Sequence, residues 1–149
     1  MRAVIVGCGR VGASLARRLA AEGHSVSVVD EKPSAFDRLD DDWSGEMVIG
    51  NGLSAATLRR AGIEKADCFA ALTQGDNRNL MAAQLAREIF KVPRVITRVY
   101  DPIRAEAYRE MGLETICSTA IGAGLIHDYF VDGVNRAPAV VGGAPSAQR

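Results

Sequence analysis

Short apolar runs alternate with longer stretches of mixed polarity along this chain of 149 residues. Several mixed stretches repeat their apolar residues at helical spacing, as Leu80, Leu85 and Ile89 do. Runs that are apolar throughout are typical of strands covered on both faces. Six strands are expected: 3–6, 26–29, 47–49, 68–72, 95–97 and 115–117. The alternation predicts an α/β fold, a doubly wound parallel sheet of six strands with right-handed crossovers.

Residues with special backbone preferences mark where the helices begin and end. Ser54 and Asp76 can each accept the free N–H groups of the helix that follows. Asp101-Pro102 predicts the start of another helix. Gly62 and Gly112 predict helix ends, because glycine adopts the left-handed conformation at little cost.

The last apolar segment differs from the others. Its apolar residues form one stripe of a helix that Ser118 or Thr119 can cap. The stripe consists of Ile121, Leu125, Ile126, Tyr129 and Phe130. Six strands already complete a nucleotide-binding sheet, so this C-terminal crossover helix is free for a subunit contact, which its large aromatic residues favour. Packing within the same chain is the alternative. One domain is expected over 1–135, followed by a flexible tail over 136–149.

The first strand is followed by the most informative motif of the sequence, Gly7-Cys8-Gly9-Arg10-Val11-Gly12. This is the G-x-G-x-x-G fingerprint of a Rossmann-like fold, placed between a strand and a helix. Gly7 permits the tight turn, Gly9 lets the backbone approach a pyrophosphate, and Gly12 lets helix and strand pack closely. Asp30 ends the second strand, where a carboxylate can bind both ribose hydroxyls and repel a 2′-phosphate. The sequence therefore predicts a nucleotide site that favours NAD(H) over NADP.

Further candidates lie at the ends of other strands. In parallel sheets the ligand lies beyond the carboxyl ends of the strands, so these residues share one rim. The candidates are Glu31, Lys32, Asn51, Gly52, Leu53, Thr73 and Arg98. Exposed charge, a simple turn and a subunit contact are the competing interpretations for several of them. Arg10 carries a guanidinium suited to phosphate, and a surface ion pair is its alternative.

Composition narrows the possible functions. Eighteen basic and eighteen acidic residues are interspersed, so no broad charge favours nucleic acid or a membrane surface. No apolar stretch reaches the roughly 18 residues that span a bilayer, so direct membrane insertion is not expected. The three cysteines are far apart, which argues against disulfides and zinc and favours a reducing cytosol. Cys8, at a helix N-terminus, could have a lowered pKa and a redox role, although a small turn-filling residue is favoured.

Several segments together resemble the regulator-of-potassium-conductance domain, also called the KTN or TrkA N-terminal domain, over residues 1 to 130. They are Gly7 to Gly12, Gly23 to Val26, Val28 to Asp30, Leu58 to Ile63, Ala66-Asp67, Thr73 with Asp76 and Asn79, and Val95 to Pro102. The resemblance implies a cytosolic gating subunit of a potassium uptake system, peripheral to the membrane through its pore partner. It also implies dimers or rings joined by the terminal helix, and binding of NAD(H), ATP or ADP.

The resemblance also assigns individual residues. Arg10 matches an arginine that family members place near ligand phosphates. Asn51 stands where the family usually has Asp; its oxygen is expected to remain an acceptor toward an adenine amino group. A second, C-terminal domain common in relatives has no counterpart in this sequence. An oxidoreductase cofactor domain is the alternative function, but no acid–base residue, Ser-His-Asp order or metal-ligand spacing is evident.

Overall fold

The sheet of this computed structural model, which describes residues 1–139, has six parallel strands in the order β3-β2-β1-β4-β5-β6. The strands are β1 Arg2–Val6, β2 Ser25–Asp30, β3 Glu46–Ile49, β4 Cys68–Ala71, β5 Arg94–Arg98 and β6 Glu114–Ile116. The helices are α1 Arg10–Ala21, η1 Pro33–Arg38, α2 Ala55–Arg60, η2 Ile63–Lys65, α3 Asp76–Gln84, η3 Leu85–Ile89, α4 Pro102–Glu110 and α5 Ser118–Asp132. The predicted six-stranded, Rossmann-like sheet is confirmed.

Strand order reverses beside β1, which pairs with β2 on one side and β4 on the other. All pairs are parallel, so the carboxyl ends of the strands meet at one edge of the sheet. The loops after β1, β2, β3 and β4 therefore share this edge. In open α/β sheets the ligand lies at this reversal point.

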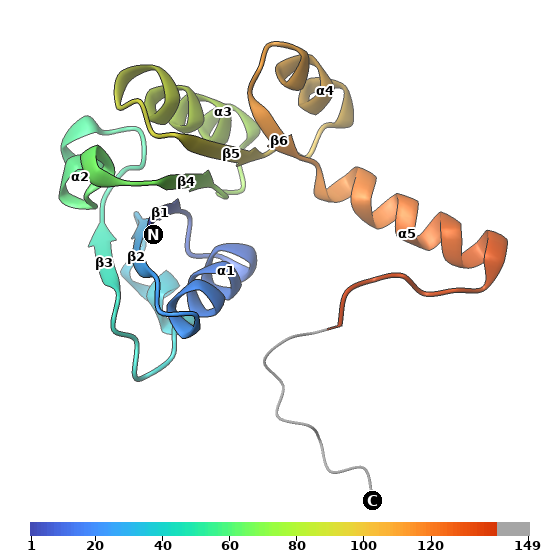
Figure 1. The fold of residues 1–149 in the computed structure, drawn as a ribbon, viewed down its shortest axis with the longest axis horizontal. Coiled ribbons are helices and arrows are strands. Elements are labelled where there is room, and N and C mark those ends of the chain that lie inside the picture. Colours follow the sequence, from blue (N-terminus) through green and yellow to red (C-terminus); the bar gives the residue numbers. More distant parts are fainter. Residues whose placement is uncertain (140–149) are drawn as a thin grey trace, which may run out of the picture. The chain divides into compact units, whose positions relative to one another are not determined.

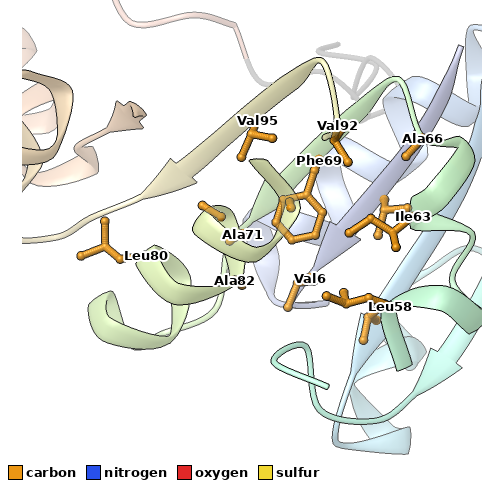
Figure 2. Close-up of a cluster of buried hydrophobic side chains, with 14 of the residues drawn as sticks. Val6, Leu58, Ile63, Ala66, Phe69, Ala71, Leu80, Ala82, Val92 and Val95 are labelled. Carbon is orange, nitrogen blue, oxygen red and sulfur yellow. The ribbon is translucent and has the colours of Figure 1, made fainter. Parts of the chain in front are cut away.

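Alternating strand residues feed two separate apolar clusters. On one face, Phe69 and its neighbours pack under α2, η2, α3 and α4, and Figure 2 shows its ring among Ile63, Ala71 and Val92. On the other face, Ile5 and Ala70 join a smaller cluster formed with α1 and η1. Figure 1 shows α1 and α3 on opposite sides of the sheet.

The second face is not covered over its whole width. Ile96 of β5 and Ile116 of β6 each remain 39% exposed. A groove of about 520 Å³ lies between Ile96 and α1, and Leu15, Leu19 and Ala70 are in its lining. The expectation that every strand is covered on both faces is wrong here. Among residues 1–139, the helical elements packed on this face are α1 and η1, and they lie over β1 and β2.

Most predicted helix boundaries are confirmed by hydrogen bonds. Ser54 caps α2 by accepting the Thr57 N–H at 3.3 Å, and Asp101 caps α4 by accepting the Ile103 N–H at 3.0 Å. Asp76 is a correction, because Gly75 is the N-cap of α3 and Asp76 is its first helical residue. The Asp76 carboxylate instead accepts N–H groups of the loop that leads from β5 to α4.

The chain divides into two units, Met1–Ser118 and the segment from Thr119. Nearly all of α5 belongs to the second unit, and none of its residues is buried. Within its own unit, Tyr129 is 52% exposed and Phe130 81% exposed. Residues 136–139 form no helix or strand, and the rest of the predicted tail lies outside the described residues. The domain boundary at 135 stays a prediction.

Candidate functional site

The phosphate loop, Gly7–Gly12, combines two glycines required by the fold with one that faces open space. Gly7 has φ +104°, and a Cβ there would lie 2.9 Å from the Leu72 carbonyl. A Cβ on Gly12 would lie 1.8 Å from the Gly7 oxygen. A Cβ on Gly9 would meet nothing within 4 Å. Packing within the protein therefore does not require glycine at position 9, and the space beside the Gly9 backbone is open.

Gly9 is also the N-cap of α1, and no side chain caps this helix. The N–H groups of its first turn therefore remain available, and the helix dipole adds positive potential at the same point. Arg10 and Val11 follow on the exposed surface. Open space, free N–H groups and a positive helix end together fit a diphosphate.

The Asp30 carboxylate faces this loop. Its Oδ2 accepts the Cys8 N–H at 2.8 Å and its Oδ1 accepts the Lys32 N–H at 2.9 Å. A carboxylate offers about four acceptor positions, so each oxygen keeps one for a ligand hydroxyl. The loop and the acid are thus held together before any ligand binds. Ribose binding by Asp30 stays a prediction.

Cys8 belongs to the core rather than to the ligand side of the loop. Its side chain is fully buried in the cluster with Ile5 and Ala13. Burial raises the pKa of the Cys8 thiol, and the nearby Asp30 carboxylate raises it further. The suggestion that the helix N-terminus lowers this pKa is wrong, because loss of hydration and the neighbouring negative charge both favour the neutral thiol.

The loop after β3 is held by a hydrogen bond within the loop and by close packing on β1. Asn51 Oδ1 accepts the Leu53 N–H at 2.8 Å, which forms an Asx turn. A Cβ on Gly52 would lie 2.3 Å from Val6 Cγ1, so the loop passes close over the end of β1. The oxygen expected to accept from an adenine amino group therefore already accepts one hydrogen bond from the chain and keeps one acceptor position. Among the described residues Asn51 Nδ2 has no hydrogen-bond partner, so this exposed amide offers a donor.

The loop after β4 is held by a network of side chains that is closed at Asn79, whereas the buried Nε of Arg98 has no hydrogen-bond partner among the described residues. Buried Asn79 accepts the Thr73 N–H at 2.8 Å and the Thr73 hydroxyl at 2.6 Å. Its amide donates to the carbonyls of Thr73 and Arg98. Arg98 Nη2 donates to the carbonyls of Leu72 and Thr73, each at 2.9 Å, and its guanidinium stacks on Tyr100. Thr73 and Arg98, predicted as ligand or subunit contacts, take part first in this internal network.

Glu31 and Lys32 differ in their surroundings. Lys32 is exposed, whereas Glu31 Oε1 lies 3.0 Å from Nη2 of Arg78 on α3. Arg78 is absent from the residues predicted for the site, because 47 positions separate it from Glu31 and no motif links them. Among residues 1–139 no three His, Cys, Asp or Glu side chains are grouped to hold a metal ion. Within the same range no helix combines the length and apolarity needed to cross a bilayer.

Comparison with known proteins gives consistent results. Residues 3–119 match the model of the TrkA-N domain family. The chain is 49% identical over 118 residues to the Trk system potassium uptake protein TrkA of Streptomyces coelicolor, which is 79% of this chain and 53% of that protein. It is 35% identical over 118 residues to a TrkA homolog of Methanothermobacter thermautotrophicus, covering 79% and 54%. The chain spans about half the length of these curated relatives.

Solved structures share the fold. The TrkA-N domain of the Escherichia coli inner membrane protein ybaL superposes with a TM-score of 0.75 at 20% identity, over 85% of this chain and 94% of that one. GsuK bound to ADP superposes with a TM-score of 0.74 at 20% identity, over 89% and 34%. At such identities the likeness shows the fold alone.

Proposed function

Because this chain belongs to the TrkA-N domain family, we propose that it is the nucleotide-sensing part of a potassium uptake system. The observation that carries the proposal is the open backbone at Gly9 beside the inward-facing carboxylate of Asp30. The similar proteins of two organisms are named as potassium uptake proteins, and GsuK has been solved with ADP and with NAD. The proposed role is regulation rather than catalysis.

The proposed ligand is NAD(H), with ATP or ADP as the alternative. Its phosphates would lie on the first turn of α1, with Arg10 supplying a nearby cation. Asp30 would accept the ribose hydroxyls. In the sheet β2 lies between β1 and β3. Asp30 ends β2, so the base would extend from the ribose toward the loop after β3, which contains Asn51, Gly52 and Leu53. Asp30 fits the ribose of each of these nucleotides equally, so the choice among them is a matter for experiment.

The proposed assembly is a homodimer, or a larger ring, joined through α5. The exposed stripe of α5 includes Ile121, Ile126 and Phe130, and the open face of β5 and β6 exposes Ile96 and Ile116. Burial of the α5 stripe and of the exposed isoleucines of β5 and β6 is favourable. We therefore propose that the α5 helix of a second copy packs on the open face. A nucleotide that binds one subunit arrangement more tightly would shift the ring toward it. The membrane pore is the proposed partner, reached from the cytoplasmic side.

Calorimetric titration with NAD, NADH, ADP and ATP tests the proposal. Gly9→Val places a side chain where a Cβ meets no protein atom, so it is expected to abolish binding while the melting temperature stays unchanged. A wild type that binds none of these nucleotides at millimolar concentration would overturn the proposed function.

A further inference from the structure

One ion pair joins the two sides of the strand-end rim. Glu31 follows β2 directly, and Arg78 lies in the first turn of α3, which follows β4. Their Oε1 and Nη2 atoms are 3.0 Å apart, and the side chains are 45% and 51% exposed. In the sheet β1 lies between β2 and β4. The pair therefore spans the carboxyl end of β1, where the phosphate loop begins.

Both partners are anchored close to that loop. Glu31 is next to Asp30, whose carboxylate holds the Cys8 N–H. On the other side, a Cβ on Gly7 would lie 3.0 Å from the Thr73 nitrogen, so the loop after β4 packs against the phosphate loop. The Cγ and Cδ atoms of Arg78 lie 3.5 Å from where a Cβ on Gly75 would stand, so the arginine stem follows that same loop.

A diphosphate on α1 would act oppositely on the two partners. Its negative charges would attract the Arg78 guanidinium and repel the Glu31 carboxylate, at separations where charges near a protein surface interact appreciably. Arg pairs with phosphate through charge-assisted hydrogen bonds at least as well as with carboxylate. An exposed ion pair is held weakly, so exchange of one anion for the other costs little.

We propose that Arg78 is an exchangeable phosphate ligand, paired with Glu31 in the free protein and with the nucleotide phosphates in the bound one. This inference rests on the proposed function and assigns a further binding residue to its site. Glu31 then competes with the ligand for the same guanidinium. Each binding event then exchanges the charge contact between Glu31 and α3 for one between the phosphates and α3, while α3 itself stays packed through its buried residues.

Opposite effects of the two partners test this exchange. Arg78→Gln is expected to weaken ADP binding about fivefold, and Glu31→Gln to strengthen it by a smaller factor, both at low salt. The double variant should bind ADP more weakly than the wild type but no more weakly than Arg78→Gln, because it also lacks the repulsion from Glu31. Adenosine binding should not change in any of them. The Arg59–Glu64 pair, at 3.1 Å with 55% and 62% exposure, is the matched control, and its Gln variants should leave ADP affinity unchanged.

The outcomes separate the two proposals. If the wild type binds ADP but Arg78→Gln and Glu31→Gln shift its affinity in the same direction, or not at all, the exchange is wrong and the proposed function stands. An equal effect on adenosine would also overturn it, because adenosine has no phosphate. If the wild type binds no nucleotide, both proposals fail together.

Discussion

The two sides of the rim use their polar groups differently, although both are built from short loops after parallel strands. Around the phosphate loop and β3, hydrogen-bonding capacity is left over: no side chain caps α1, Asp30 keeps acceptor positions, and Asn51 keeps a free amide. Around β4 and β5, the side chain of Asn79 makes four hydrogen bonds inside the protein. Unused polar capacity next to open space indicates a binding surface, whereas a closed network indicates a rigid wall that positions it.

The largest expected effect on stability comes from removing the hydrogen bonds of Asn79 around β4 and β5, which we call the closed side of the rim. Asn79→Ala removes four hydrogen bonds. It leaves the Thr73 N–H and the Arg98 carbonyl without this partner, whereas the Thr73 carbonyl keeps the bond from Arg98. We therefore expect a loss of about 3 kcal/mol in the free energy of unfolding. Urea denaturation measures it. Asn135→Ala, at an exposed position, serves as the control. A loss below about 1 kcal/mol would mean that water replaces the network, and that this side is not a rigid wall.

The next largest effect is expected at Asp30, on the side of the rim formed by the phosphate loop and β3, which we call the open side. Asp30→Ala removes the predicted ribose acceptor and two backbone contacts. We expect nucleotide affinity to fall by about tenfold or more. The free energy of unfolding should fall by about 2 kcal/mol, because hydrogen bonds to charged groups are the stronger kind and one of the two is exposed. Calorimetry and denaturation on the same samples separate the two effects. If stability fell by several kcal/mol while affinity stayed constant, Asp30 would belong with the closed side.

This difference between the sides explains what the sequence could predict. The six alternating strands, the glycine loop and the place of Asp30 follow from local patterns, and the structure has all three. The role of Asn79 and the pairing of Arg78 depend on contacts between loops far apart in sequence, for which no local pattern exists. The favoured interpretation of Cys8 as a small turn-filling residue agrees with its burial against Ile5 and Ala13, and only the suggested lowering of its thiol pKa is wrong.

A smaller effect is expected for base recognition at Asn51. The free amide can donate to a ring nitrogen of adenine or to the 6-oxygen of hypoxanthine, so the wild type should bind ADP and inosine diphosphate within a few fold of each other. Asn51→Asp keeps an acceptor for the Leu53 N–H but replaces the donor by an acceptor. We expect it to favour ADP over inosine diphosphate by about fivefold, roughly 1 kcal/mol.

Gln74→Glu is the control for this change, because it adds the same charge at an exposed position after β4. It should weaken both nucleotides alike and leave their ratio unchanged. An unchanged ratio in Asn51→Asp would show that the β3 loop does not contact the base edge, and would move the base away from this part of the open side.

The smallest effect concerns Cys8, which lies behind the phosphate loop. Because burial and Asp30 raise the pKa of its thiol, the folded state binds this proton more tightly than the unfolded state does. Its contribution to stability is therefore fully present below the unfolded pKa, about 8.5, and is lost as pH rises through the higher folded pKa. At alkaline pH this group should lower the free energy of unfolding of the wild type by at most about 1.4 kcal/mol per pH unit. Cys8→Ala should lack this contribution to the pH dependence.

Alkylation at pH 8 should likewise modify half-exposed Cys68 well before Cys8. Faster reaction at Cys8 would mean that the thiol reaches the open side of the loop, and that the boundary between core and ligand surface runs behind it.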